Sequence, residues 1–263
     1  MNVWLVKPEG FVHSDGLRHI AESFADAMGT KVVVSSVNPE EKCLVFGAHL
    51  LVKCNSGHIV YNTEQISSRL FEWYPLYGEI LESHEVWDYS RLNIKNLRDL
   101  EIDARLVEIG FSETMVRPSG GVVPKDIDVL FYGSVNDRRN KILDGLFGKC
   151  KLHHVYGVYG TELDILIARS RVVLNMHYHD AGIHEIFRTS YLMANGSLVV
   201  TEVGRDHDLE GPWLSSMWFT IYDELVGQCL KACENYSPEF GENAHKMFSK
   251  RTQKQIIQEI GNV

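Results

Sequence analysis

Short apolar runs alternate with segments of helical periodicity along most of the chain. At the start, apolar runs at 2–6 and 31–36 flank a segment, 17–28, whose apolar residues recur at helical spacing. Gly29 follows that segment, in the place where a helix C-terminus favours glycine. Two strands joined by a helix are expected to be parallel, because the crossover between them is right-handed and returns the chain to the same end of the sheet. The alternation therefore predicts an α/β protein with parallel sheets.

A stretch without periodicity divides this pattern into two blocks. Residues 111–128 hold two prolines and two adjacent glycines, which is typical of an interdomain linker. We therefore expect two Rossmann-like, parallel-sheet domains that face a cleft. The expected parts are a first domain at 1–115, a linker at 116–127, a second domain at 128–235 and a helical tail at 236–263.

The loops that follow the predicted strands are where functional residues are expected, because open α/β sheets bind ligands beyond the carboxyl ends of their strands. Pro75 should interrupt the helical pattern at 65–83. A helix is also predicted from His184 onwards, and a polar loop at 203–213. The predicted strands are 2–6, 31–36, 43–51, 58–64, 85–90, 104–110, 128–134, 152–158, 171–178 and 197–202.

The net charge of −9 argues against broad, non-specific nucleic-acid binding, which depends on lysine and arginine neutralising phosphates. It leaves room for a local basic cleft, and a small anionic ligand would need one. The apolar runs are too short for a transmembrane helix, and the first residues lack the pattern of a signal peptide.

The five cysteines are odd in number and form no CxxC pair, so a disulfide framework is not expected. Their pattern favours a reducing compartment, and we therefore expect a cytoplasmic location. Cys229 and Cys233 lie four residues apart in a predicted helix. A shared helix face explains that spacing better than a metal site does.

The segment LFYGSVNDRRNKIL (130–143) ends a strand at Gly133 and Ser134 and places Arg138 and Arg139 in the first turn of a helix. Cations there face the positive end of the helix dipole, which costs a few tenths of a kcal/mol or more. An anion bound between them and the free N–H groups would reverse that cost. The segment therefore indicates either a phosphate site or two solvated arginines. It matches neither a Walker loop nor GxGxxG.

The segment HEIFRTSYLMANGSLVVTE (184–202) begins with titratable residues directly after a strand. Glu185 and Arg188 are three residues apart and could simply pair with each other. Their place at a helix start after a strand also suits a ligand. Arg188 could bind a phosphate, and Glu185 could accept hydrogen bonds from sugar hydroxyls.

Residues 177–185 contain side chains that resemble a loose metal cluster. They are His177, His179, Asp180, His184 and Glu185. The two histidines of an HxH pattern in a strand share one face. The spacing nevertheless matches neither HExxH nor a familiar zinc motif. Polar residues that line a sugar pocket are the favoured interpretation.

Candidate general bases in the first block follow predicted strands or precede helices. Asp15 and Asp88 could equally be helix caps. The remaining candidates are His13, His19 and Glu64.

Three segments of the second block resemble the nucleotide-sugar domain of GT-B glycosyltransferases: DVLFYGSVNDRRNKIL, LIARSRVVLNMHYHD and HEIFRTSYLMANGSLVVTE. VWDYSRLNIKNL and YNTEQ in the first block resemble the same proteins, chiefly the small bacterial and viral members, and the likeness covers most of 60–205. It implies a second domain that binds a nucleoside-diphosphate sugar and a first domain that binds the acceptor. It also implies no metal or other cofactor, because basic residues and a helix N-terminus offset the charge of the leaving diphosphate.

Carried over to this chain, the resemblance implies that the diphosphate is held by Gly133, Ser134, Arg139 and Arg188, and that Asn175 and His177 line the pocket. Glu185 would contact the sugar or ribose. The residues assigned to the donor by motif or by resemblance are Gly133, Ser134, Arg138, Arg139, Asn175, His177, His184, Glu185 and Arg188.

Many retaining members of the family carry two glutamates eight positions apart on this helix, but here Met193 stands eight residues after Glu185. Inversion and retention therefore both stay open. An inverting enzyme would need a base, for which we favour Asp15, then Asp88 or His19. The acceptor could be a glycan, a lipid, a protein or a modified DNA base, and UDP is among the possible nucleotides. The alternatives are a non-catalytic nucleotide-sugar module and a metal-dependent hydrolase.

Overall fold

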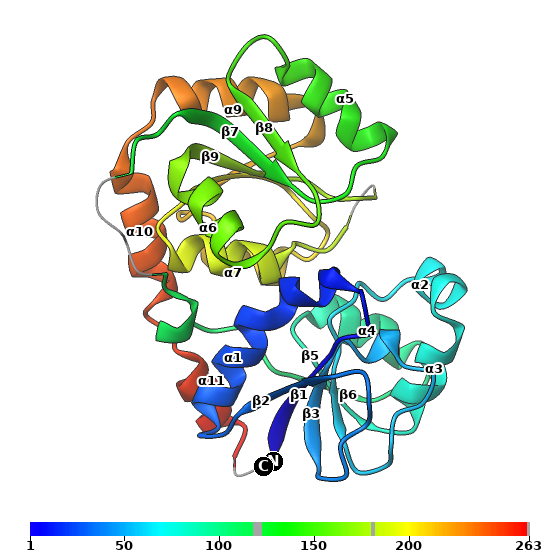
Figure 1. Cartoon of the computed structure of the whole chain (residues 1–263). Coiled ribbons are helices and arrows are strands. Elements are labelled where there is room, and N and C mark those ends of the chain that lie inside the picture. The colour runs from blue at the N-terminus through cyan, green and yellow to red at the C-terminus, as the bar shows by residue number, and fades with distance from the viewer. Residues whose placement is uncertain (118–122, 180–181, 262–263) are drawn as a thin grey trace. The chain divides into compact units, whose positions relative to one another are not determined.

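The computed structural model describes residues 1–117, 123–179 and 182–261. The chain divides into two compact units, which we call the first unit (Met1–Met115 with Arg251–Val263) and the second unit (Val116–Lys250). Each unit has its own parallel sheet with helices on both faces (Figure 1). The predicted fold class, an α/β chain with two parallel-sheet domains, is confirmed.

The sheet of the first unit has six parallel strands in the order β2-β1-β3-β4-β5-β6. Its central strands are buried on both faces, as expected where helices cover a parallel sheet. The strands are β1 (Asn2–Val6), β2 (Val32–Ser35), β3 (Cys43–Phe46), β4 (Ile59–Tyr61), β5 (Glu85–Asp88) and β6 (Ala104–Leu106).

Helix α1 covers one face of this sheet and α2, α3 and α4 cover the other (Figure 1). On the α1 side, Phe24 meets the stacked rings of Phe46 and Tyr61 edge-on, with ring centroids 5.3 and 4.9 Å away. The α-helices are α1 (Arg18–Ala27), α2 (Ser68–Trp73), α3 (Pro75–Glu82), α4 (Arg91–Arg98) and α11 (Gln253–Glu259). The 3-10 helices are η1 (Val12–Leu17), η2 (Ala48–Leu50) and η3 (Glu113–Met115).

Pro75 interrupts the helical pattern as predicted. Helix α2 ends at Trp73, and α3 begins at Pro75 itself. Proline suits the first position of a helix because the N–H that it lacks would have no partner inside the helix.

The sheet of the second unit has five parallel strands in the order β11-β10-β9-β7-β8. Helices α5 and α9 lie on one face and α6 and α7 on the other (Figure 1). The strands are β7 (Ile127–Tyr132), β8 (Leu152–Val155), β9 (Ser170–Asn175), β10 (Leu198–Glu202) and β11 (Trp218–Thr220). The helices are α5 (Asp137–Leu146), α6 (Gly160–Arg169), α7 (Ile186–Ala194), α8 (His207–Glu210), α9 (Leu225–Glu234), α10 (Pro238–Phe248), η4 (Gly211–Trp213) and η5 (Tyr222–Glu224).

Two local predictions for the second unit were wrong, and one strand was missed. Helix α7 begins at Ile186, not at His184, because Glu185 has non-helical backbone angles. The expected polar loop at 203–213 contains α8 and η4. Strand β11 was not predicted, since three residues are too few for a periodic pattern.

Each sheet reverses its winding direction beside its first strand. In the second unit the chain passes from β7 to β8 on one side, and then returns to β9 on the other side. The two loops that leave the carboxyl ends of β7 and β9 therefore diverge, which is the arrangement that leaves space for a ligand in open α/β sheets.

The C-terminal helices belong to different units. Helix α10 packs on α7 in the second unit, whereas α11 packs on α1 in the first. Gly110 allows the return of the chain, because a Cβ there would lie 2.7 Å from Ile256 Cδ1 and 2.8 Å from the backbone of Gln253. Its N–H donates to Gln253 Oε1 at 2.7 Å.

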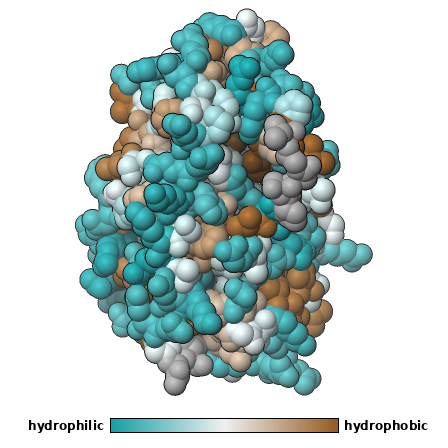
Figure 2. Space-filling model, turned by 90° about the vertical axis from the view of Figure 1, so that its left-hand side faces the viewer, coloured by the Kyte–Doolittle hydropathy of each residue, from teal (hydrophilic) through white to brown (hydrophobic). Residues whose placement is uncertain are grey.

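None of the helices in the described residues combines the length and the apolar composition that crossing a bilayer requires. On the face shown in Figure 2, hydrophilic side chains predominate and hydrophobic ones form small scattered patches. Such patches are ordinary on a folded protein.

Replacing Gly241 with alanine should destabilise the second unit. A Cβ on Gly241 would lie 1.8 Å from the carbonyl oxygen of Gly196, so α10 would have to move away from the turn after α7. We expect a loss of about 1–3 kcal/mol in the free energy of unfolding, measured by denaturant titration.

The matched control is Gly227→Ala in α9, where a Cβ meets no atom within 4 Å. That exposed helical position should gain up to about 1 kcal/mol from the better helix former. Equal stabilities of G241A and the unsubstituted chain would contradict the packing described for α10.

Candidate functional site

The turn after β7 brings together three of the residues that the sequence singled out. Gly133 has φ of +142°, a region that other residues rarely adopt. A Cβ on Gly133 would lie 3.2 Å from Nη2 of Arg188 and 3.6 Å from Nη1 of Arg139. A glycine is therefore needed for this backbone to pass so close to two guanidinium groups.

Arg139 is 3% exposed and held mainly by backbone carbonyls. Its guanidinium donates to the carbonyl oxygens of Ser134 at 2.9 Å, Met176 at 2.6 Å and His177 at 3.3 Å. Burial lowers the pKa of Arg139 to about 10, so the group still carries its charge at neutral pH. A buried cation in a fixed position is suited to binding an anion.

Arg188 reaches the same turn from α7. Its Nη1 donates to Oδ1 of Asn175 at 2.9 Å, at the end of β9. Its guanidinium carbon lies 5.0 Å from the centre of the Tyr132 ring, within the range of a cation–π contact. Arg188 is therefore oriented by residues from the two strands that flank the point where the sheet reverses.

Glu185 lies between these two arginines. Its carboxylate oxygens are 3.6 Å from Nη2 of Arg139 and 3.9 Å from Nη2 of Arg188. Burial acts to raise the pKa of Glu185, but Arg188 and Arg139 outweigh it and the pKa falls below its ordinary value. Because both ion pairs are long, the carboxylate and the guanidinium groups keep hydrogen-bonding capacity for a further partner.

Arg138 has a different environment from its neighbour Arg139. Both oxygens of Glu202 accept hydrogen bonds from its guanidinium, which also lies 3.9 Å from the centre of the Tyr222 ring. The Tyr222 hydroxyl donates to the Arg138 carbonyl at 2.6 Å. These contacts tie α5 to β10 and give Arg138 a structural role. Sequence reasoning did not single out Glu202, although it ends a predicted strand.

Two fully buried histidines flank this group. The Nε2 of His184 lies 2.8 Å from the Thr189 hydroxyl, and burial lowers the pKa of His184 to about 3. Burial also lowers the pKa of His177. Within the described part of the chain, neither ring nitrogen of His177 has a hydrogen-bond partner. Its Nε2 faces Gly204, a residue that the sequence analysis missed, where a Cβ would lie 3.2 Å away.

The histidine-rich segment does not form a metal site in the part of the chain that the structure covers. Among residues 1–117, 123–179 and 182–261, no group of three or more His, Cys, Asp or Glu side chains could hold a metal ion. Asp180, one of the five candidates, lies outside the described residues.

Two candidate bases of the first unit, Asp15 and Asp88, have different hydrogen-bond partners. Asp15 accepts hydrogen bonds from Lys7 at 2.6 Å and Arg18 at 2.9 Å. Burial acts to raise the pKa of Asp15, but these two cations outweigh it and the pKa is lowered. A carboxylate with a lowered pKa is a weak base. His19 is partly buried in the first turn of α1.

Asp88 is fully buried at the end of β5. It accepts hydrogen bonds from Nδ2 of Asn62 at 2.5 Å, from the N–H of Ser90 at 2.7 Å and from Nδ2 of Asn93 at 3.2 Å. These bonds fix the start of α4, so the geometry of Asp88 is that of a structural residue.

The first unit contains a histidine–carboxylate pair of which only the carboxylate was a predicted candidate. The Nδ1 of His49 lies 3.2 Å from Oε1 of Glu64, and the His49 ring meets the ring of Tyr74 edge-on. Burial lowers the pKa of His49. The sequence analysis named Glu64 but not His49, because the strand predicted at 43–51 included His49; the structure ends β3 at Phe46 and places His49 in η2.

No model of a known protein family matches the chain. It is similar to uncharacterised proteins of Acanthamoeba polyphaga mimivirus. It is 27% identical to protein L140 over 192 residues, which is 70% of this chain and 62% of L140. It is 29% identical to protein L137 over 178 residues, which is 66% of this chain and 24% of L137. The matched region is thus less than two thirds of the length of these relatives.

Solved structures resemble the chain over nearly its whole length. WaaG, a glycosyltransferase involved in lipopolysaccharide biosynthesis, has a TM-score of 0.59 at 10% identity, covering 98% of this chain and 96% of WaaG. Anabaena HepE in complex with UDP has a TM-score of 0.58 at 12% identity, covering 99% and 98%. A glycosyltransferase from Rickettsia africae has a TM-score of 0.56 at 10% identity, covering 98% and 96%. With its two parallel-sheet units and these structural neighbours, the chain has the GT-B glycosyltransferase fold.

Proposed function

We propose that this protein transfers a sugar from a nucleoside-diphosphate sugar to an acceptor hydroxyl, and that the second unit binds the donor. The observation that carries the proposal is the convergence of Arg139 and Arg188 on the Gly133 turn, where the sheet reverses its winding. The GT-B fold supports it, as does the presence of UDP or UDP-glucose in structures of HepE.

The two arginines fit the chemistry of a diphosphate leaving group. Negative charge grows on the diphosphate as its bond to the sugar breaks. Guanidinium groups bind phosphate oxygens through paired N–H donors, and charges fixed in advance need no reorganisation during the reaction. In this proposal Arg139 and Arg188 take the role that a divalent cation has in metal-dependent transferases, so no metal or other cofactor is needed.

The neighbouring polar groups suit the sugar part of the donor. The ionised carboxylate of Glu185 can accept hydrogen bonds from hydroxyl groups of the sugar or of the ribose. Asn175 accepts a hydrogen bond from Arg188 and so orients it. In this proposal the buried, neutral rings of His177 and His184 lie beside the bound sugar.

The proposal leaves open both the class of acceptor and whether the reaction inverts or retains the configuration of the sugar. If the reaction inverts, a base in the first unit must take the acceptor proton. The contacts of Asp15 and Asp88 are those of structural carboxylates, so we retain His19 as the proposed base. The proposed acceptor is a hydroxyl group of a glycan, a lipid, a protein or a modified DNA base. All five cysteines are free, which accords with the proposed cytoplasmic location.

A thermal-shift screen against UDP, GDP, ADP, CDP and their common sugars should show one nucleotide that raises the melting temperature, with no effect of EDTA. The same donor should be hydrolysed slowly by the protein, as detected by release of free sugar. Binding without any hydrolysis or transfer would favour a non-catalytic module. A fall in melting temperature with EDTA, and no nucleotide response, would favour a metal-dependent hydrolase.

Arg188→Gln should weaken binding of that nucleotide sugar by about tenfold to a hundredfold. The substitution removes charge-assisted hydrogen bonds worth roughly 1.5–3 kcal/mol. Isothermal titration calorimetry gives the affinity. The control is Arg171→Gln in the same unit, which removes an exposed arginine paired with Asp128 and should leave the affinity unchanged. An unaltered affinity in R188Q would exclude Arg188 as a donor ligand.

Gly133→Ala should lower donor affinity, because the added methyl group pushes against the guanidinium of Arg188. The control is Gly157→Ala, which also stands at a positive φ but has no atom within 4 Å of its Cβ position. Both variants should lose about 1 kcal/mol or more of folding stability from backbone strain. Only G133A should lose affinity, and equal affinities would mean that the turn does not shape the donor site.

A further inference from the structure

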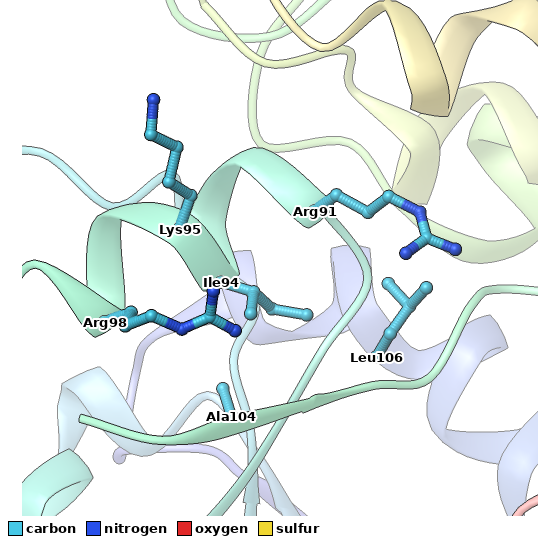
Figure 3. A pocket seen from close by; sticks show the side chains of 6 residues that line it. All are labelled: Arg91, Ile94, Lys95, Arg98, Ala104 and Leu106. Carbon is cyan, nitrogen blue, oxygen red and sulfur yellow. The ribbon is translucent and has the colours of Figure 1, made fainter.

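The first unit contains a second cationic feature, made of residues other than those of the candidate site in the second unit. An open cavity of about 310 Å³ lies between α4 and β6, the strand at one edge of the sheet. We call it the α4 groove. Three of its six lining residues are basic, three are apolar and none is acidic. They are Arg91, Ile94, Lys95 and Arg98 from α4, and Ala104 and Leu106 from β6 (Figure 3).

The basic side chains of the groove share one face of the helix. Arg91, Lys95 and Arg98 are spaced by four and three residues, which places them in one row along α4. Like charges at this spacing repel each other by a few tenths of a kcal/mol. Arg91 also stands at the first position of the helix, where the dipole disfavours a cation. Lys95 and Arg98 lie in the last turn, where the dipole favours a cation, so the dipole cost falls on Arg91 alone and an anion beside Arg91 would offset it.

None of these three cations has an ion-pair partner among residues 1–117, 123–179 and 182–261. No carboxylate of the described residues therefore competes with a ligand for these three side chains. They differ in this from Arg169, which pairs with Asp126, and from Arg251, which pairs with Glu108.

The side chains are arranged as a pair of arginines over an apolar surface. Figure 3 shows the guanidinium groups of Arg91 and Arg98 on either side of Ile94, above the apolar residues of β6. Lys95 extends away from β6 in the same view. Guanidinium groups match the oxygen geometry of a phosphate, and the apolar residues can cover the C–H groups next to it.

We propose that the α4 groove binds the phosphate group of a small phosphate ester, with Arg91 and Arg98 as its ligands. The volume is at the lower end of the range for small-molecule sites, so the ligand is no larger than a small phosphorylated metabolite. A long polyanion fits less well, because a net charge of −9 opposes its approach beyond two arginines. The proposal does not depend on glycosyl transfer.

Titration calorimetry with glucose 6-phosphate, and with glucose for comparison, tests the proposal. The measurements are made on the full chain carrying Arg188→Gln, so that binding at the Gly133 turn is weakened throughout. We expect binding of glucose 6-phosphate but not of glucose. R91Q and R98Q should each weaken it by about tenfold, as expected for loss of a charge-assisted hydrogen bond.

Lys95→Gln is the matched control, because it keeps the side-chain stem that lines the groove and removes only a charge that extends away from β6 (Figure 3). Its affinity should change by less than about threefold, the effect of an exposed charge that makes no contact. Ala104→Leu gives a second readout: it fills the groove without changing its charge, and should also abolish binding.

Three results would overturn the proposal. The first is no binding of glucose 6-phosphate. The second is an equal loss in K95Q, R91Q and R98Q, which would mean diffuse attraction to a basic helix. The third is binding only to vesicles that contain anionic lipid, which would make this face a membrane contact. Binding of the nucleotide sugar to chains with Arg188 intact should be the same with R91Q as without it, so failure here leaves the proposed function untouched.

Discussion

Two positive charges that meet at one backbone turn are the constraint on which the second unit's site depends. Arg139 and Arg188 repel each other, and one of them is almost fully buried. Their closeness is offset by Glu185 between them and by the carbonyl groups that accept from Arg139. Holding cations together in this way costs free energy. A bound anion recovers part of that cost, which is why such an arrangement suits a ligand site better than a structural one.

The parallel sheet is what makes this convergence possible. Gly133 follows β7, Arg139 lies in the first turn of α5, and Arg188 lies in α7 after β9. These elements are far apart in sequence, yet β7 and β9 are hydrogen-bonded neighbours whose carboxyl ends meet at one edge. The loops leave that edge in opposite directions because β8 lies on the other side of β7. The residues therefore gather because of strand order, and no single contiguous motif is required.

This explains how much could be predicted from sequence. Apolar periodicity located the strands, and the rule that ligands lie beyond strand ends then pointed to Gly133, Arg139, Glu185 and Arg188. Sequence could not tell Arg138 from Arg139, because their difference depends on a partner, Glu202, that arrives from another strand.

Long-range packing could not be predicted from the sequence either, because it too depends on partners that are distant along the chain. The role of Asp88 depends on amide groups of Asn62 and Asn93, which only the folded chain brings near. The return of α11 to the first unit depends on the match between Gly110 and Gln253, more than a hundred residues apart. Local pattern carries no information about such pairs, so the tail could be predicted as helical but not assigned to a unit.

The two cationic features of the chain differ in construction, and the difference has a physical consequence. The arginines at the Gly133 turn are anchored by protein groups and largely removed from water, so salt screens them weakly. Arg91 and Arg98 are exposed and lack protein partners among the described residues, so ions in solution compete directly for them. Ionic strength should therefore affect an anion in the α4 groove more strongly than a diphosphate at the Gly133 turn. The two proposed anion sites therefore differ in character: the anchored arginines suit stabilisation of a fixed charge, and the unanchored pair suits reversible recognition.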